Sequence, residues 1–302
     1  MSEQSADVRL SEKPESRARE TLSALLANRL AVAGLVVLAL LVVVGIFGRA
    51  IAPYGINEID IANRLAPPSA EHWFGTDDLG RDVLSRVLVA ARVSLQVGFI
   101  AVGFSLAVGV PIGLVAGYFR GAIDSVLMRM MDILFSFPAI LLAIAILAVL
   151  GPGIGNAMIA IGLVYTPIFA RITRGSVLVA SEEVYIRAAR SLGARDSRII
   201  FLHILPNVMA PIIVQTTLSL AFAILSEAAL SFLGLGVQPP NPAWGRMLSE
   251  GRNFFQQAPW MGIFPGIAIL VTVMAFNFIG DGLRDALDPK QKSVIESRGR
   301  SA

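Results

Sequence analysis

SEEVYIRAARSLGARDSRIIFLHILPN, residues 181–207, is a charged, helix-forming segment that lies between long apolar stretches of the chain. A polar segment in such a setting is typical of a water-facing connector in a membrane protein. Ser181 is expected to cap a short helix with Glu182 and Glu183 in its first turn, because carboxylates are favoured at a helix N-terminus. Gly193 is expected to end that helix in a left-handed conformation.

The predicted helix has a face of small side chains. Ala188 and Leu192 lie four residues apart, as do Ala189 and Gly193, so each pair falls on one side of the helix. Another backbone can approach such a face closely, and Arg187 lies beside it. The segment is therefore suited to docking into a soluble partner. An ordinary solvated loop is the alternative that periodicity alone leaves open.

The composition places the chain in a lipid bilayer. Of its 302 residues, 55% are hydrophobic and 16% are charged, against about 25% charged residues in soluble domains. The net charge of +3 is small, and no basic stripe interleaved with aromatic residues indicates nucleic-acid binding. The chain has no Cys and only two His, His72 and His203, which excludes disulfides and Cys-based metal sites and predicts no metal site.

Uncharged runs long enough to cross a bilayer recur along the chain. A spanning helix needs about 20 mostly apolar residues. The run 133–170 would be roughly 57 Å long as a helix, enough for two crossings, and Gly151-Pro152-Gly153 supplies the turn between them. The sequence thus predicts an all-α integral membrane protein with six transmembrane helices, in the runs 30–48, 93–119, 133–170 (two helices), 204–226 and 260–280.

Lys and Arg residues are divided unevenly between the two sides that six spans define. Eighteen of the 25 fall on the side of the termini and seven on the other. Because cytoplasmic loops are enriched in Lys and Arg, both termini and residues 181–207 are predicted to be cytoplasmic. The predicted organisation is a cytoplasmic N-terminal tail (1–29), a first transmembrane helix (30–51), an extracytoplasmic segment (52–92), a five-helix core that includes residues 181–207 (93–286) and a cytoplasmic C-terminal tail (287–302).

The predicted extracytoplasmic segment is long for a loop. Val83, Val87 and Ala91 recur in it at helical spacing, which predicts an interfacial helix leading into the second span. The connection before the last span contains a Pro-rich stretch, residues 238–242, followed by Trp244. This pattern is typical of a rigid turn with an aromatic anchor at the membrane interface.

The sequence contains no site of its own for an energy source or for catalysis. The motif Gly-x-x-x-x-Gly-Lys-Ser/Thr, which cradles nucleotide phosphates, is absent, because none of the three lysines follows a Gly. A proton or sodium relay would require ionisable groups at the bilayer midplane, whereas Glu227 and Asp132 fall at span ends, where a structural role is expected. Ser, His and acidic residues form no hydrolase constellation within the spans. A non-catalytic membrane subunit is therefore expected.

Residues 181–207 resemble the EAA loop of ATP-binding-cassette importer permeases. The family pattern is Glu-Ala-Ala, three residues, Gly, nine residues, Ile, any residue and Leu-Pro. The residues at these places are Arg187-Ala188-Ala189, Gly193, His203 and Leu205-Pro206. The Gly and Leu-Pro spacing is retained. Two residues depart from the pattern: Arg187 stands in place of the Glu, and His203 stands in place of the Ile. The family's acidic contact to the ATPase therefore does not transfer to residue 187.

Three further stretches resemble the C-type permease of dipeptide and oligopeptide importers, so the likeness extends over nearly the whole chain. They are HWFGTDDLGRDVLSRVL (72–88), EAALSFLGLGVQPPNPAW (227–244) and FNFIGDGLRDALDP (276–289). The resemblance implies a type I importer permease fold in the bacterial plasma (inner) membrane, forming half of the pathway for dipeptides or oligopeptides. It also implies a B-type permease partner, two ATPase subunits that bind ATP and Mg, and an extracytoplasmic substrate-binding protein, with no cofactor in this chain.

The resemblance implies roles for two sets of residues. Contact with the ATPase is expected at Arg187, Ala188, Ala189, Leu192, Gly193, Leu205 and Pro206. Docking of the binding protein is expected at Trp73, Gly75, Asp77, Arg81 and Trp244. A related importer for glutathione or metal chelates is left open as an alternative, as are a stand-alone secondary carrier and a membrane scaffold without transport activity.

Overall fold

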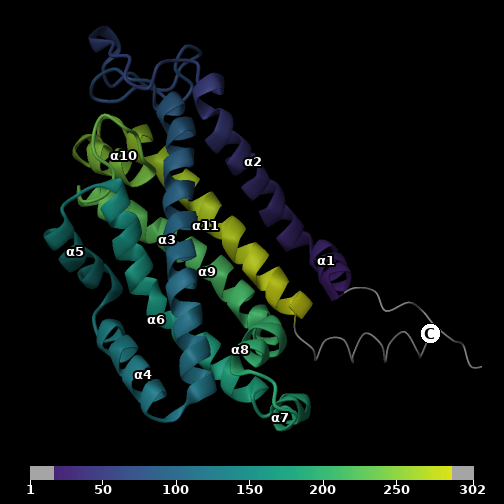
Figure 1. The fold of residues 1–302 in the computed structure, drawn as a ribbon. Coiled ribbons are helices and arrows are strands. Elements are labelled where there is room, and N and C mark those ends of the chain that lie inside the picture. The colour runs from purple at the N-terminus through teal and green to yellow at the C-terminus, as the bar shows by residue number, and fades with distance from the viewer. Residues whose placement is uncertain (1–16, 288–302) are drawn as a thin grey trace, which may run out of the picture.

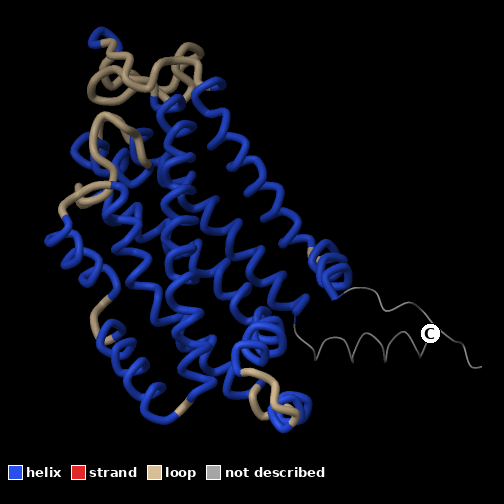
Figure 2. The backbone as a smooth tube through the Cα atoms, viewed as in Figure 1, coloured by secondary structure: helices blue, strands red, loops and turns tan. Residues whose placement is uncertain are grey.

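The computed structural model in Figure 1 describes residues 17–287, and every regular element within this range is helical. Residues 1–16 and 288–302, which include most of the two predicted tails, lie outside the described range. Figure 2 shows the helices packed side by side, with loops concentrated at the two ends of the bundle. The all-helical membrane fold predicted from the sequence is confirmed.

Five helical segments are long and apolar enough to cross a membrane. One of them, Asp196–Phe232, joins three elements without a break: a short helix α8, the π-helical turn η2 and the long helix α9. The five segments are α2 (Arg29–Ile51), α3 (Val83–Phe119), α6 (Ile154–Ala180), α8 with η2 and α9 (Asp196–Arg198, Ile199–Ile204 and Leu205–Phe232), and α11 (Trp260–Leu287).

The third predicted span is a bent pair of helices in the structure. α4 (Gly121–Phe135) and α5 (Ala139–Leu150) meet at an angle of 92°, so the molecule has six spans if this pair counts as one. Pro138 lies at the break, where it lacks the N–H that a continuous helix requires. With 12 residues, α5 is about 18 Å long and is too short to cross the bilayer core alone.

The interfacial helix predicted before the second span is the first part of α3. The Asp82 carboxylate accepts a hydrogen bond from the Ser85 backbone N–H at 2.7 Å and caps the helix, which then continues without a break to Phe119. Val83, Val87 and Ala91 are buried, as their spacing indicates, but they pack within the bundle. The predicted helix that leads into the second span is therefore present as the first turns of α3, because no breaker interrupts the helix between residues 83 and 93.

A row of glycines brings the backbones of α3 and α6 together. Gly109, Gly113 and Gly117 lie one turn apart on α3, and a Cβ atom added at any of them would overlap backbone or side-chain atoms of α6. At Gly113 the obstruction is the carbonyl oxygen of Ala170. Small residues at this spacing are the usual means by which helices associate in lipid. The α3–α6 pair is thus the packed centre of the fold.

The short elements lie at the two ends of the bundle (Figure 1). One end carries the segment 52–82 with η1 (Ile61–Asn63), together with α10 (Trp244–Gly251) and η3 (Arg252–Phe254). The other end carries α7 (Val184–Ser191). The described part of the predicted N-terminal tail contains the helix α1 (Arg17–Ala27), whose Leu25 is buried beside Gly282 of α11.

The glycine row generates a prediction about stability. Gly113→Val should lower the unfolding temperature of the detergent-solubilised protein, because overpacking of a close-packed contact costs about 1–3 kcal/mol. Gly103→Val is the matched control, since Gly103 lies on the same helix with no atom within 4 Å of the added Cβ. Equal unfolding temperatures for the two variants would show that the α3–α6 contact is not tightly packed.

Candidate functional site

The helix α7 lies at the end of the bundle opposite the segment 52–82 and connects α6 to the α8–η2–α9 run (Figure 1). Ser181 does not cap it. Ser181 ends α6, with its backbone N–H bonded to the Val177 carbonyl at 2.9 Å, and its buried hydroxyl has no partner among the described residues. Glu183 precedes α7 and makes no side-chain capping bond. The predicted cap was wrong because α6 extends to Ala180, which places Ser181 at a helix C-terminus.

The end of α7 has the geometry that the sequence predicts. Gly193 has φ of 78°, in the left-handed region. The Ala194 N–H donates to the Ala189 carbonyl at 3.1 Å, and the Gly193 N–H donates to the Arg190 carbonyl at 3.0 Å. These two bonds form a Schellman motif, which satisfies carbonyls that a helix end otherwise leaves free. Gly193 therefore fixes the direction in which the chain leaves α7.

One face of α7 is buried and the opposite face is exposed. Ile186 has no accessible surface and belongs to the main hydrophobic core together with Ile199 of η2. Val184 is 72% exposed and Leu192 is 88% exposed, and Ala188 between them is also exposed. These three residues, four apart on one side, are called here the apolar strip. Its apolar surface is open to a partner that could cover it.

Two other residues of the predicted set flank the strip. Arg187 is exposed, whereas Ala189 is half-buried because it lies on the side of α7 that faces the bundle. The pair Ala189 and Gly193 therefore contributes less to the accessible face than the sequence suggests. The exposed face is formed mainly by Val184, Ala188 and Leu192.

Polar contacts attach the segment around α7 to the end of α3. The Tyr118 hydroxyl donates to the Asp196 carboxylate at 2.6 Å, and the Arg190 guanidinium lies over the Tyr118 ring, 5.2 Å from its centre. Arg120 donates to the Glu182 carboxylate at 2.5 Å, and this hydrogen bond lowers the pKa of Glu182 below its usual value. Because the Arg120–Glu182 pair is exposed, its contribution to stability is small.

A second set of contacts attaches α7 to the beginning of α9. The Asn207 amide donates to the Tyr185 hydroxyl at 2.9 Å and to the His203 carbonyl at 2.6 Å. Leu205 is half-buried and Pro206 is exposed at the start of α9, directly after the π-helical turn η2. α7 is thus held to the end of α3 by Arg190 and to the beginning of α9 by Tyr185, and it follows α6 directly along the chain.

The residues expected to dock the binding protein lie at the other end, and the structure gives most of them internal contacts. Asp77 is buried and accepts bonds from the Arg81 backbone N–H at 2.9 Å and from the Arg81 Nε at 2.6 Å. The Trp244 indole is buried and donates to the Val87 carbonyl at 3.1 Å. Their side chains are therefore not available for docking.

Trp73 and Gly75 differ from these three residues. Trp73 is 69% exposed, so its ring is accessible at this end of the molecule. Gly75 has φ of 71° and its carbonyl accepts the N–H of Val83, which joins the loop to the start of α3. Of the five predicted docking residues, Trp73 alone presents a largely exposed side chain.

The sequence reasoning missed the contacts that position α7. Ile186 and Tyr118 were not singled out, although an isolated Ile in a polar helical stretch is a recognisable signal of a buried face. Glu227 of α9 is buried, and its carboxylate accepts bonds from Ser94 at 3.2 Å and Ser231 at 2.7 Å, which fits the structural role expected for it. Within residues 17–287, no group of three or more His, Asp or Glu side chains is placed to hold a metal ion.

Two family models match the sequence. The model described as "Binding-protein-dependent transport system inner membrane component" matches residues 109–293. The model described as "N-terminal TM domain of oligopeptide transport permease C" matches residues 16–68. Together they cover the region of α7 and the first span.

Curated relatives match over most of their length. The chain is 53% identical over 275 residues to the dipeptide transport system permease protein DppC of Alkalihalophilus pseudofirmus, covering 91% of this chain and 90% of that protein. It is 51% identical over 254 residues to the glutathione transport system permease protein GsiD of Escherichia coli O6:K15:H31, covering 84% of each chain.

Among solved structures, the chain is similar to one chain of the MetNI methionine ABC transporter in an inward-facing conformation. The TM-score is 0.55 at 18% sequence identity, and the match covers 67% of this chain and 97% of that one. At this identity the likeness concerns the fold alone.

The burial of Ile186 generates a prediction about the rigidity of α7. Ile186→Ala should speed amide hydrogen exchange across residues 184–193, because removing a buried Ile side chain costs about 2–5 kcal/mol and Ile186 is the one buried residue of α7. Leu192→Ala, which shortens an exposed side chain, is the control and should leave the exchange unchanged. Unaltered exchange in the Ile186 variant would show that the polar contacts alone hold α7.

Proposed function

Because the chain belongs to the family of binding-protein-dependent transport system inner membrane components, as an OppC-type permease, we propose that α7 is the site at which ATPase subunits drive it. The protein is the non-catalytic permease subunit of an ABC importer and a multi-pass component of the inner membrane. The observation that supports a driving role for α7 is its apolar strip, exposed on a helix that contacts the ends of α3 and α9 and packs Ile186 into the core.

The proposed mechanism transmits movement through the contacts of α7. ATP and Mg bind to the ATPase subunits, whose closure displaces the surface that covers Val184, Ala188 and Leu192. Because Ile186 is locked in the core, α7 moves with the ends of α6 and α9 rather than separately from them. The spans then alternate between outward and inward openings.

The proposal also includes the other subunits of the importer and the orientation of this chain in the membrane. Two ATPase subunits, a B-type permease and an extracytoplasmic binding protein complete the importer. The two permeases each supply one half of the pathway. Both termini and α7 lie in the cytoplasm, which is supported by the 18 Lys and Arg residues on that side against seven on the other. Residues 52–92 then face the extracytoplasmic side.

The binding protein docks at the extracytoplasmic end in this proposal. Trp73 supplies the accessible contact, since its ring is 69% exposed. Gly75, Asp77, Arg81 and Trp244 act indirectly by holding the loop and α10 against α3. This division follows from burial, because a buried side chain cannot contact a docking partner.

The cargo proposed is a short peptide, a dipeptide in the first place. This rests on the relative named as a dipeptide permease, at 53% identity over 91% of the chain. The relative named as a glutathione permease, at 51% identity over 84%, supports glutathione as the second candidate. A metal chelate is a third candidate within the same importer class. Both named cargoes are small molecules with peptide bonds and free carboxylates.

A bulky substitution on the apolar strip should uncouple transport. Ala188→Phe should leave the protein inserted but reduce ATP-driven uptake in reconstituted vesicles about tenfold or more, which corresponds to a loss of about 1.4 kcal/mol in docking. The reason is steric, because Ala188 is the small residue at the centre of the strip. Ala122→Phe is the matched control, an exposed Ala at the start of α4. Normal uptake by the Ala188 variant would exclude α7 as the driven site.

Competition should identify the cargo. In vesicles that hold the complete importer and its binding protein, uptake of a labelled dipeptide should be abolished by excess unlabelled dipeptide and only weakly reduced by glutathione. Stronger competition by glutathione would assign the chain to the second candidate. Insensitivity to both compounds would contradict a short-peptide cargo.

A further inference from the structure

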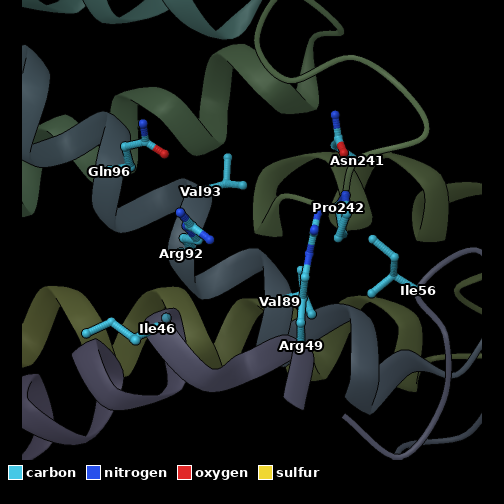
Figure 3. A pocket seen from close by; sticks show the side chains of 10 residues that line it. Ile46, Arg49, Ile56, Val89, Arg92, Val93, Gln96, Asn241 and Pro242 are labelled. Atoms are coloured by element: carbon cyan, nitrogen blue, oxygen red, sulfur yellow. The ribbon is translucent and has the colours of Figure 1, made fainter. Parts of the chain in front are cut away.

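Two arginines at the extracytoplasmic end of the bundle line one cavity. This arginine pocket, of about 370 Å³, lies between α2, α3 and the loop before α10, and Arg49, Arg92, Gln96 and Asn241 supply its polar groups. Figure 3 shows that Arg49 extends from α2 toward Asn241 and Pro242, while Arg92 and Gln96 come from the neighbouring helix α3. No Asp or Glu lines the pocket.

The charges of Arg49 and Arg92 are not balanced within the described residues. Neither arginine forms an ion pair in the range 17–287. Two other arginines at the same end of the bundle do form ion pairs: Arg81 pairs with Asp77 at 2.6 Å, and Arg86 pairs with Glu250 at 3.0 Å. Both Arg49 and Arg92 are exposed, so an anion from outside the chain can reach them. The pocket is therefore suited to an external anion.

An apolar groove continues from the pocket along α2 and α3. The groove has a volume of about 280 Å³ and shares Gly45, Ile46 and Arg92 with the arginine pocket. Its remaining residues are Val42, Leu95 and Phe99. Val42 precedes Arg49 by two helical turns, so the groove runs from the end of α2 toward the middle of the span.

Close packing of the two helices forms the floor of both cavities. A Cβ atom added at Gly45 would lie 3.4 Å from the Arg92 Cα, and one at Gly48 would lie 2.8 Å from the Leu88 carbonyl oxygen. α2 and α3 therefore touch through their backbones at this level. Their longer side chains, Ile46 and Phe99 among them, flank the line of contact and remain exposed.

We propose that the arginine pocket and the apolar groove bind one anionic phospholipid of the outer leaflet. Its phosphate is held by the Arg49 and Arg92 guanidinium groups, whose fork geometry suits phosphate, while Gln96 and Asn241 donate to the headgroup. One acyl chain lies in the groove lined by Val42 and Phe99. A basic cavity that opens into an apolar groove matches the shape and charge distribution of such a lipid, whereas a free anion would not need the groove. The choice of the outer leaflet rests on the proposed orientation of the chain. The existence of the pocket and the groove is independent of that orientation.

Lipid retention by the purified importer tests the proposal without transport or ATP. Phosphatidylglycerol that stays bound in mild detergent is counted by native mass spectrometry. Replacing both arginines, Arg49→Gln with Arg92→Gln, should reduce its retention about tenfold or more, since the charge-assisted hydrogen bonds to the phosphate are lost. Val42→Trp should reduce retention as well, because it fills the groove without changing either arginine. Arg64→Gln, which removes one exposed charge of the same extracytoplasmic segment, is the control and should have no effect.

Each other outcome overturns the proposal. Loss of retention in the arginine variant with full retention in the Val42 variant would mean that the pocket holds a free anion or a peptide carboxylate. Equal retention in all variants would mean that neither cavity binds lipid. Displacement of the lipid by excess dipeptide would assign the pocket to cargo. None of these outcomes depends on whether α7 is driven by ATPases, so the two proposals fail separately.

Discussion

The backbone contact between α3 and α6 is the constraint on which the rest of the structure depends. Helices in lipid gain little from burying apolar surface, so they associate where small residues let their backbones approach. Gly109, Gly113 and Gly117 provide that approach along three turns of α3. Because α3 has no side chain at these three positions, α6 packs closely against it, and α7 follows the end of α6 and contacts the end of α3 through Arg190.

The function proposed for α7 follows from this arrangement. A helix of eight residues is not stable alone, so its order comes from the contacts that hold it. Those contacts reach α3 through Arg190, which lies over the Tyr118 ring, the core through Ile186, and α9 through Tyr185 and Asn207. A partner that covers the exposed strip can displace α7 only by displacing the helix ends to which it is attached. In the proposed mechanism, movement at this exposed face therefore becomes movement of the membrane spans.

Local features of the fold were predictable from the sequence, because periodicity and breakers are local. The left-handed end at Gly193 and the exposed Ala188 and Leu192 are of this kind. The prediction of a cap at Ser181 was wrong because the extent of α6 depends on its packing with α3. The 92° bend at Pro138 was also missed, since a Pro allows either a kink or a break.

Contacts between distant residues could not be predicted in the same way. Trp244 reads as an interface anchor in the sequence, but its partner, the Val87 carbonyl, is 157 residues away along the chain. Arg86 meets Glu250 across 164 residues. The residues at the end of the bundle that carries the segment 52–82 therefore looked like a docking surface, while the fold uses most of them internally. Trp73 kept its predicted exposure because it lies at the loop surface.

Crosslinking from Leu192 tests the central claim most directly. The natural chain has no Cys, so Leu192→Cys introduces a single thiol at a residue that is 88% exposed. In the assembled importer, a short bifunctional reagent on this thiol should join the chain to an ATPase subunit, with a yield that changes when ATP is added. If the thiol reacts instead with a membrane-impermeant reagent from outside intact cells, or joins no ATPase under any condition, the account of α7 is contradicted.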